Sequence, residues 1–513
     1  MKLTIAQINA TVGDLSGNVE RCLHAWKTAA AQETDLVIFP EMVIPGYPPR
    51  DILYDPSFAE AVELATADLA AQGEGLPPAL VGTFSTHIPN GFTPVNIGGH
   101  PGLFNIAALL QNGTVTPAAY KQLLPIYDVF YEPRWFRPGP QLPPIEIAGK
   151  KIGVVVCEDM WDAEYDVHPP AAQIAAGAEL LINLSASPFR LGMLDERARV
   201  CTRDIPVMYV NLVGATDELI FDGRSFVMQN KQITAQAAGF QEDILTLDLD
   251  AEPTPIPTER WEKTVYDALV LGVRDFAQKN GLKRAALGLS GGVDSALVAV
   301  IAADALGGPN VTTVAIPSRY SDPRSTSSAQ ELATQLDMQY AEVPLDEMHK
   351  AAETSLETLL DGGNTAENIQ ARLRMLVLTS YVNAQGGLLL NTSNKTELAM
   401  GYSTLYGDMA GSVSPLGDLN KTQVYAVARW LHETRGVIPA FILDRAPSAE
   451  LRPDQVDPFD YEKISPELDT LVEANQSSLP IRRSEHKRWL MGIILKVSRK
   501  AFGTGRLIPV TRR

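Results

Sequence analysis

The chain has 513 residues, of which 45% are hydrophobic and 20% are charged, and its formal net charge at pH 7 is −18. These proportions are typical of a globular protein with two or three domains, and they exclude collagen-like, low-complexity and disordered classes. The negative charge argues against a protein that binds the phosphate backbone of nucleic acids, and no apolar run approaches the roughly 20 residues of a membrane-spanning helix.

The first half of the chain alternates apolar segments with alanine-rich segments. The segment 171–178 has the composition of a helix. Short runs of β-branched and apolar residues are predicted to be strands, at 3–9, 35–40, 151–159, 179–185 and 207–214. This alternation predicts a layered α/β domain.

A proline-rich segment follows. Pro253, Pro255 and Pro257 lie within five residues, and such a run cannot continue a helix or a central strand. We therefore expect a linker at 251–258, between a first domain at residues 1–250 and a second domain at residues 259–513.

The second half alternates strands and helices regularly. Strands are predicted at 284–290, 311–317 and 387–393, and helices at 295–307 and 327–337. This order predicts a doubly wound parallel sheet of the Rossmann-like kind. Because no internal repeat relates the two halves, we expect two different folds in one chain.

The cysteines and the start of the chain indicate the cellular compartment, and the charge distribution indicates where an anion could bind. Cys22, Cys157 and Cys201 are too few for a disulfide framework or a cysteine-rich zinc site, and the start MKLTIAQINATVGD lacks a signal peptide, so we expect a cytoplasmic protein. Residues 1–250 carry 15 basic and 30 acidic residues, a net charge of −15, whereas residues 251–513 carry 28 and 31, a net charge of −3. The segment 482–513 has ten basic residues and one acidic residue, which allows a local anion site there.

A glycine-containing loop connects the strand that ends at Leu289 to the helix that begins near Ser295. Residues 290–295 read Ser-Gly-Gly-Val-Asp-Ser. Two glycines let backbone N–H groups converge on an anion, and the helix N-terminus adds its dipole. A Gly-Gly pair alone is also common in a tight strand-to-helix turn. The full SGGVDS loop resembles the pyrophosphate loop of the N-type ATP pyrophosphatases, which cleave ATP between the α and β phosphates.

Four further segments resemble the NAD synthetase family: 368–375 (NIQARLRM), 391–425, 445–455 and 485–488 (EHKR). The resemblance spans nearly all of residues 260–513. It implies ATP contacts at Gly288, Leu289, Ser290, Gly291, Gly292, Val293, Asp294, Ser295, Thr392, Lys421 and Ser448. It further implies magnesium ligands at Asp294 and Glu397, and contacts to the substrate deamido-NAD at Arg372, His486 and Lys487. Leu405 stands where a small ammonia-dependent member of the family has a substrate-binding lysine, which leaves the contacts around 405–412 open.

In the first half, Glu41, Lys121 and Cys157 stand where predicted strands end or loops begin. Each residue alone is common, as a helix-terminal charge, a surface lysine or a buried core thiol. Their flanks, LVIFPEMVIPGYPPRDIL, YKQLLPIYDVFYEPRWFRPG and IGVVVCEDMWD, resemble the three signature regions of the nitrilase superfamily. The resemblance covers about residues 1–245 and implies an α-β-β-α sandwich. The GYPPRD extension resembles the glutamine amidohydrolase domain that is fused to NAD synthetases.

The chemistry agrees with these residue types, because amide hydrolysis needs a nucleophile, a base and a donor to the developing oxyanion. The resemblance implies that Cys157 is the nucleophile, that Glu41 is the base, and that Lys121 stabilises the thiolate and the oxyanion, the latter together with the N–H of residue 158. Glu132 would orient Lys121. The resemblance also implies that Tyr127 and Ser187 recognise glutamine.

Met193 departs from the pattern, because relatives often carry a lysine there. If that lysine holds the α-carboxylate of glutamine, Arg190 is the obvious replacement cation in this chain.

Together, the two resemblances imply a carbon–nitrogen ligase that amidates deamido-NAD through an adenylated intermediate. Glutamine, ATP and Mg²⁺ would be required, no redox cofactor is expected, and the products would be NAD, AMP, pyrophosphate and glutamate. We expect internal transfer of ammonia, a homo-oligomer, and neither nucleic-acid nor membrane partners. Two alternatives stay open: another ATP-pyrophosphatase amidotransferase or tRNA-modifying relative, and an inactive regulatory protein that binds glutamine or NAD precursors.

Overall fold

The computed structural model describes residues 1–87, 96–97, 100–256, 258–360, 363–476, 481 and 484–503. The chain divides into two compact units, one of Met1–Thr216 with Ile220–Thr258, the other of Asp217–Leu219 with Glu259–Arg513. Pro257 and, in the basic segment 482–513, residues 482, 483 and 504–513 lie outside the described residues. Among the residues described, no helix combines the length and the apolar character needed to cross a membrane.

The first unit contains two six-stranded sheets. The first sheet has the order β16 (Asp243–Asp248), β1 (Lys2–Gln7), β2 (Leu36–Ile38), β3 (Ala79–Ser85), β6 (Phe104–Gln111), β7 (Thr114–Tyr120). The second has the order β15 (Gln232–Gln236), β14 (Phe226–Gln229), β11 (Val207–Asn211), β10 (Leu180–Ser185), β9 (Lys150–Val156), β8 (Ile145–Ile147). Two short pairs accompany them, β4 (Asn96–Ile97) with β5 (His100–Pro101) and β12 (Val213–Thr216) with β13 (Leu219–Asp222).

The helices of this unit are α1 (Leu15–Ala30), α2 (Pro56–Gln72), α3 (Pro169–Ala175) and α4 (Met193–Val200). Its 3-10 helices are η1 (Arg50–Tyr54), η2 (Glu132–Arg134) and η3 (Cys157–Glu164).

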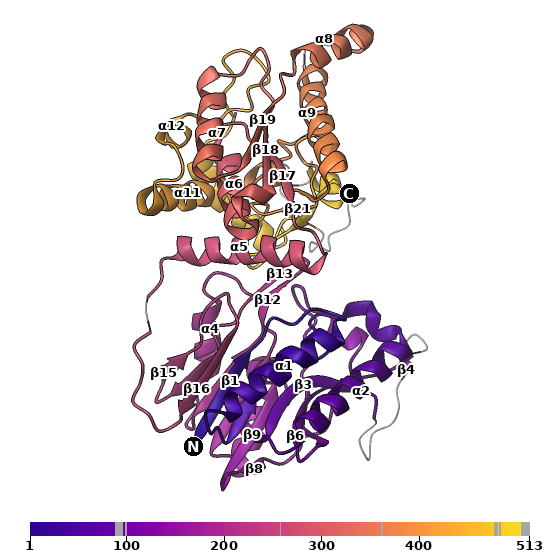
Figure 1. The fold of residues 1–513 in the computed structure, drawn as a ribbon, viewed down its shortest axis with the longest axis vertical. Helices are drawn as coiled ribbons and strands as arrows, with labels where there is room; N and C mark the ends of the chain where they lie inside the picture. The colour runs from indigo at the N-terminus through magenta and orange to yellow at the C-terminus, as the bar shows by residue number, and fades with distance from the viewer. Residues whose placement is uncertain are drawn as a thin grey trace. The chain divides into compact units, whose positions relative to one another are not determined.

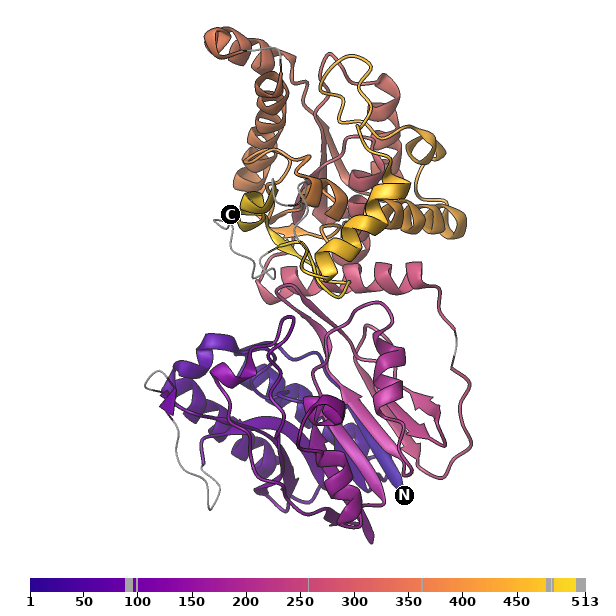
Figure 2. The ribbon, with the colours of Figure 1, turned by 180° about the vertical axis from the view of Figure 1, so that it is seen from behind.

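The two sheets pack face to face. Leu3 and Ile38 of the first sheet share one buried cluster with Val154, Ile182 and Met208 of the second. Helices α1 and α2 cover the outer face of the first sheet, whereas α3 and α4 pack on the second (Figures 1 and 2). The predicted α-β-β-α sandwich is therefore confirmed.

The second unit is built on a parallel sheet of the order β19 (Gln339–Glu342), β18 (Val311–Ala315), β17 (Ala285–Gly288), β20 (Leu388–Leu389). A further pair is formed by β21 (Val413–Ser414) and β22 (Ile493–Ile494). The helices are α5 (Trp261–Lys279), α6 (Val293–Leu306), α7 (Pro323–Gln335), α8 (Asp346–Ser355), α9 (Asn364–Gln385), α10 (Lys395–Met400), α11 (Lys421–Arg435), α12 (Ala440–Asp444) and α13 (Tyr461–Glu473), with the 3-10 turns η4 (Gly308–Asn310), η5 (Glu357–Leu359) and η6 (Glu485–Leu490).

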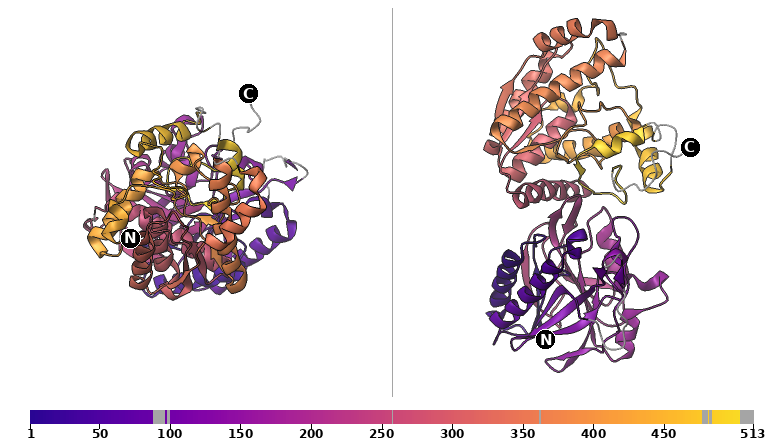
Figure 3. Two further views of the ribbon diagram at one scale, coloured as in Figure 1. Left: turned by 90° about the horizontal axis from the view of Figure 1, so that it is seen from above. Right: turned by 90° about the vertical axis from the view of Figure 1, so that its right-hand side faces the viewer.

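Helices α6 and α7 lie on one side of this parallel sheet, and α9 lies on the other (Figure 1). The right-hand view of Figure 3 shows α9 in front of the sheet. Three strands, β17, β18 and β20, were predicted from their apolar runs, as were α6 and α7, and the doubly wound fold is confirmed.

Some predicted boundaries were wrong for local reasons. The helix predicted at 171–178 ends at Ala175, because Gly177 adopts a positive φ of 93°. The helix predicted at 327–337 begins earlier, at Pro323, because the Asp322 side chain caps it by accepting a hydrogen bond from the Arg324 N–H. The strand predicted at 207–214 is divided between β11 and β12.

Candidate active sites

Four residues of the first unit that are far apart in the sequence form one buried cluster. Glu41 follows β2, Lys121 follows β7, Glu132 begins η2, and Cys157 is the first residue of η3, directly after β9. The Lys121 Nζ lies 2.8 Å from Glu41 Oε1 and 2.8 Å from Glu132 Oε2. None of the four residues is more than 3% exposed. A single ammonium group thus joins two carboxylates beside a thiol, away from bulk water.

Burial dominates the protonation of this cluster. It raises the pKa of the Cys157 thiol, and the charge of Glu41 adds to this rise, whereas Lys121 and a hydrogen bond with Ser185 oppose it. Burial also raises the pKa of Glu132 to about 7 against the opposing charge of Lys121. Although burial alone would lower the pKa of Lys121, the charges of Glu132 and Glu41 raise it well above its usual value. At neutral pH the cluster therefore holds a neutral thiol and a charged lysine.

Further residues hold the two carboxylates in place, and no pattern in the sequence singled these residues out. Asn105 Nδ2 donates to Glu41 Oε1 at 2.7 Å, and the N–H of Ala186 donates to Glu41 Oε2 at 2.9 Å. The Tyr47 hydroxyl donates to Glu132 Oε1 at 2.9 Å. Each carboxylate is therefore held in one orientation.

The backbone at the thiol has an unusual conformation. Cys157 has a φ of 48°, in the left-handed region that non-glycine residues seldom adopt. Two residues later, the Asp159 carboxylate accepts hydrogen bonds from the N–H groups of Val156, Gln122 and Leu123. These bonds tie the turn that carries the thiol to the segment that follows Lys121.

A carboxylate and two phenols lie beside the thiol. Glu158, the residue after Cys157, is 3% exposed and accepts hydrogen bonds from the hydroxyls of Tyr127 and Tyr165, both at 2.9 Å. Burial raises the pKa of Glu158, and the two phenols oppose that rise. Tyr127 itself is 49% exposed, so this group reaches the surface. A carboxylate in this position can accept an ammonium group of a ligand.

Ser187 is held by a buried arginine that was not predicted. Arg197, in α4, is fully buried and donates from Nε to Ser187 Oγ at 3.1 Å and from its NH2 group to the Ser187 carbonyl oxygen at 2.7 Å. Its NH1 group pairs with Asp222 Oδ1 at 2.7 Å. The Asn211 side chain accepts from the Ser187 N–H at 2.9 Å. Arg197 thus holds Ser187 in position, and Asp222 neutralises the charge of Arg197.

The neighbouring Met193 begins α4, and Arg190 forms an ion pair with Glu196. The cation that the sequence offered as a replacement for the missing lysine therefore already has a partner.

In the second unit, the loop between β17 and α6 has the compact shape that its glycines predict. Gly291 has a φ of 76°, and a Cβ atom there would lie 2.4 Å from the carbonyl oxygen of Ser325. The Ser295 hydroxyl accepts from the Ser290 N–H at 3.2 Å and donates to the carbonyl oxygen of Gly292 at 3.0 Å. Only glycine fits at 291, and the loop closes on the first turn of the helix.

Three charged side chains converge next to this loop. Lys421 Nζ lies 2.6 Å from Asp294 Oδ2 and 3.2 Å from Glu397 Oε1. Helix N-termini place them: Asn394 caps α10 in a capping box with Glu397 and also donates to Asp294, and Asn420 caps α11 directly before Lys421. Local capping thus aims the side chains at one point.

The donor set at this point suits a magnesium ion. Burial raises the pKa of Glu397 to about 7, against the charge of Lys421. In the described part of the chain, no group of three or more His, Cys, Asp or Glu side chains is arranged to hold a metal ion. Two carboxylates still fit Mg²⁺, which usually takes few protein ligands and completes its shell with water and substrate phosphates.

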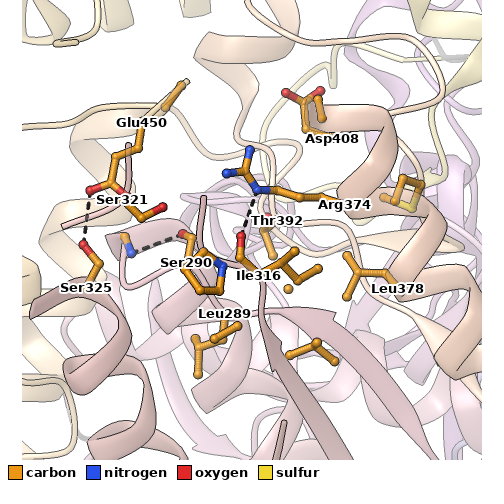
Figure 4. A pocket seen from close by; sticks show the side chains of 18 of the residues that line it. Leu289, Ser290, Ile316, Ser321, Ser325, Arg374, Leu378, Thr392, Asp408 and Glu450 are labelled. Carbon is orange, nitrogen blue, oxygen red and sulfur yellow. Dashed lines mark hydrogen bonds between the residues drawn. The ribbon is translucent and has the colours of Figure 1, made fainter. Parts of the chain in front are cut away.

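Two adjoining cavities, of about 260 and 160 Å³, lie over the loop. Figure 4 shows the larger of them. Six of the predicted ATP-binding residues line the larger cavity: Gly288, Leu289, Ser290, Gly292, Thr392 and Ser448. Eight line the smaller cavity: Ser290, Gly292, Val293, Asp294, Ser295, Thr392, Lys421 and Ser448. Gly291 lines neither, because it packs on Ser325. All other predicted ATP residues therefore share this space, as does Glu397.

The three residues predicted to contact deamido-NAD line neither cavity. Arg372 Nε donates to the Leu405 carbonyl oxygen at 3.2 Å, and Lys487 Nζ donates to that of Gly401 at 2.8 Å. Burial lowers the pKa of Lys487. His486 is exposed. The structure thus brings Arg372 and Lys487 to the same loop, 401–405, but not to the space over the glycine loop.

Comparisons with known proteins match the two halves separately and the chain as a whole. The carbon-nitrogen hydrolase family matches residues 2–255, and the NAD synthase family matches residues 265–498. Glutamine-dependent NAD(+) synthetases of Synechocystis and Rhodobacter capsulatus are 36% and 38% identical, over 99% and 100% of this chain and 98% of each relative.

Among solved structures, the glutamine-dependent NAD+ synthetase of Acinetobacter baumannii in complex with ADP is 28% identical with a TM-score of 0.79, covering 99% of this chain and 98% of that one. The enzyme from Cytophaga hutchinsonii has the same fold, with a TM-score of 0.81 at 21% identity over 99% and 97% of the two chains.

Proposed function

The chain belongs to the glutamine-dependent NAD(+) synthetases, which are ligases, and we propose that residues 1–250 release ammonia from glutamine while residues 259–513 use ATP to amidate deamido-NAD. The observation that carries the first half of this proposal is the buried contact of Lys121 with Glu41 and Glu132 beside Cys157. The second half rests on the glycine loop and the convergence of Lys421 with Asp294 and Glu397.

The glutaminase reaction begins with proton transfer, because burial keeps the Cys157 thiol neutral. Glu41, held by Asn105 and Lys121, takes the thiol proton. The thiolate then attacks the amide carbon of glutamine, and Lys121 together with the N–H of residue 158 stabilises the oxyanion. The same proton passes to the departing ammonia, and water hydrolyses the thioester to glutamate. Glu132 keeps Lys121 charged and oriented.

Recognition of glutamine follows from the groups around the thiol. The Glu158 carboxylate, held by Tyr127 and Tyr165, has the charge that an α-ammonium group needs. Ser187 offers its hydroxyl, which is held by Arg197. The α-carboxylate has no free cation at Arg190, which is paired with Glu196.

In the synthetase half, the loop N–H groups and Lys421 hold the ATP phosphates, and Thr392 and Ser448 line the same cavities. The ADP complex of the Acinetobacter baumannii relative supports this assignment. Asp294 and Glu397 would hold Mg²⁺, which would neutralise the charge of the leaving pyrophosphate. The carboxylate of deamido-NAD attacks the α-phosphorus, pyrophosphate leaves, and ammonia then displaces AMP to give NAD. Arg372, His486 and Lys487 would bind deamido-NAD from the 401–405 side.

The proposal includes internal transfer of ammonia and a homo-oligomer. In neutral water most ammonia is protonated and is not nucleophilic, so release into solution would waste it. Sedimentation of the full chain measures the oligomeric state. Comparison of NAD formed per glutamate released, with and without an enzyme that removes free ammonia, measures the transfer.

One assay tests the proposed function. The full chain is supplied with ATP, Mg²⁺ and deamido-NAD, with either glutamine or ammonium chloride as the nitrogen source. We expect NAD, AMP and pyrophosphate in equal amounts from both sources, and glutamate only from glutamine. Formation of ADP and phosphate instead would contradict cleavage between the α and β phosphates.

A further inference from the structure

One arginine in the wall of the larger cavity has no assigned role. Arg374 lies on α9, and in Figure 4 its guanidinium points into the cavity. Its Nε donates to the carbonyl oxygen of Ile316, directly after β18, at 3.2 Å. This bond fixes the guanidinium plane and leaves the two terminal nitrogens for another partner.

The charge of Arg374 is not matched by an ion pair. Within the described ranges, no carboxylate forms an ion pair with its guanidinium, whereas Arg445 in the same cavity pairs with Glu450 at 2.7 Å. Burial lowers the pKa of Arg374, and the more distant charges of Glu450 and Asp408 oppose this shift. Arginine stays protonated in proteins, so a half-buried cation stands in the wall of this cavity. A partly buried guanidinium without an ion-pair partner suits an anionic ligand.

The linings of the two cavities show which part of ATP lies beside this cation. The larger cavity has an apolar end, formed by Leu289, Val314, Ile316, Met375 and Leu378, which suits the adenine ring. The smaller cavity contains Asp294, Glu397 and Lys421, which suit the β and γ phosphates with Mg²⁺.

The two cavities share seven lining residues: Ser290, Gly292, Thr392, Asp408, Arg445, Ser448 and Ala449. Of these, Arg445 is already paired with Glu450. The α-phosphate, which joins the adenosine to the other phosphates, therefore lies at this junction. Arg374 lines the adenosine side of the junction and not the smaller cavity.

We propose that Arg374 binds the non-bridging oxygens of the α-phosphate of ATP and is a further catalytic residue of the amidation. This inference rests on the proposed function. A carboxylate oxygen of deamido-NAD forms a bond to the α-phosphorus, the bond from that phosphorus to the bridging oxygen breaks, and pyrophosphate leaves with the electron pair. The non-bridging α-phosphate oxygens carry negative charge throughout this exchange, and a planar guanidinium matches two of them.

The first test compares three variants of the full chain in NAD synthesis from ammonium chloride. Arg374→Leu removes the cation, and Arg374→Lys keeps the charge without the planar fork. Arg284→Leu is the matched control, because Arg284 is exposed and lines neither cavity. We expect turnover to fall roughly 100-fold in both Arg374 variants and to stay unchanged in the control. An unchanged melting temperature of the second unit, measured by calorimetry of the full chain, would show that this unit is folded in each variant. Wild-type turnover in either Arg374 variant would overturn the inference.

The second test separates phosphate contact from a structural role. ATP with sulfur in place of one non-bridging α-oxygen exists as two diastereomers, and contact with Arg374 should make the wild type prefer one of them. We expect this preference to shrink by at least about tenfold in Arg374→Lys, because the discriminating contact is lost. A preference that is unchanged in the variant, or that Cd²⁺ abolishes in the wild type by binding the sulfur, would refute contact with Arg374. If the wild type makes no NAD with ordinary ATP, it is the proposed function that fails.

Discussion

Replacement of Lys121 by methionine tests how the glutaminase site is held together. The Lys121 Nζ lies 2.8 Å from Glu41 Oε1 and 2.8 Å from Glu132 Oε2, and all three side chains are buried. Removing one partner from a buried charge cluster typically costs about 3 to 5 kcal/mol, because the remaining charges lose their compensation. For a unit of this size, that corresponds to a fall in Tm of roughly 10 °C.

The cost should depend on pH. Because the pKa of Glu132 in the folded protein is about 7, above its ordinary value of 4.5, the folded state holds a proton there that the unfolded state releases, and stability falls as pH rises through that window. Without Lys121, which lowers the pKa of Glu132, this window extends to higher pH. The difference in Tm between Lys121→Met and the wild type should therefore be larger at about pH 8.5 than at about pH 6.

Calorimetry of the full chain measures these differences in Tm. Because ATP should bind only the second unit, the unfolding transition whose Tm does not change when ATP is added is assigned to the first unit. Lys151→Met, at an exposed position of β9, is the control and should melt like the wild type. Glutaminase activity of Lys121→Met should fall by at least about 1000-fold, because both thiolate and oxyanion lose their cation, while ammonium-supported NAD synthesis persists. A pH-independent difference in Tm, or retained glutaminase activity, would refute this reasoning.

Three other substitutions test single assignments. Cys157→Ala should abolish NAD synthesis from glutamine but not from ammonium chloride. Cys22 is also buried, and Cys22→Ala, the control, should leave both activities unchanged. Loss of both activities in a folded Cys157→Ala chain would contradict separate sites. Gly291→Ala would bring a Cβ atom to 2.4 Å from the Ser325 carbonyl oxygen, so NAD synthesis from either nitrogen source should be lost while glutaminase activity remains. Arg197→Lys should raise the KM for glutamine about tenfold with little change in ammonium-supported synthesis, and an unchanged KM would remove its positioning role.

The sequence predicted the reactive residues better than the residues that hold them in position. Glu41, Lys121 and Cys157 stand in strings of residues that together resemble one family, so they could be named without a structure. Asn105 and Arg197 stand on an ordinary strand and an ordinary helix, and their partners are set by the tertiary fold: Asn105 lies 64 positions from Glu41. No local pattern encodes such a pairing.

The arginines of α9 show the same limit within one helix. Arg372 and Arg374 are two residues apart, which places them roughly 200° apart around the helix axis. Resemblance singled out Arg372, whereas the packing of α9 on the sheet decides which of the two faces the cavity, and that residue is Arg374. Family membership, for its part, removes the tRNA-modifying alternative that the glycine loop alone left open.

The left-handed backbone at Cys157 has a consequence for the evolution of the site. A φ of 48° is unfavourable for every residue with a Cβ atom, by roughly 1 kcal/mol, and favourable for glycine. In most positions a change from alanine to glycine destabilises a protein, but here Cys157→Gly should be at least as stable as Cys157→Ala. Once the thiol is lost from this turn, selection for stability alone would therefore favour glycine over alanine there. The buried thiol itself packs in the core between the sheets, so its backbone strain is offset in part by that packing.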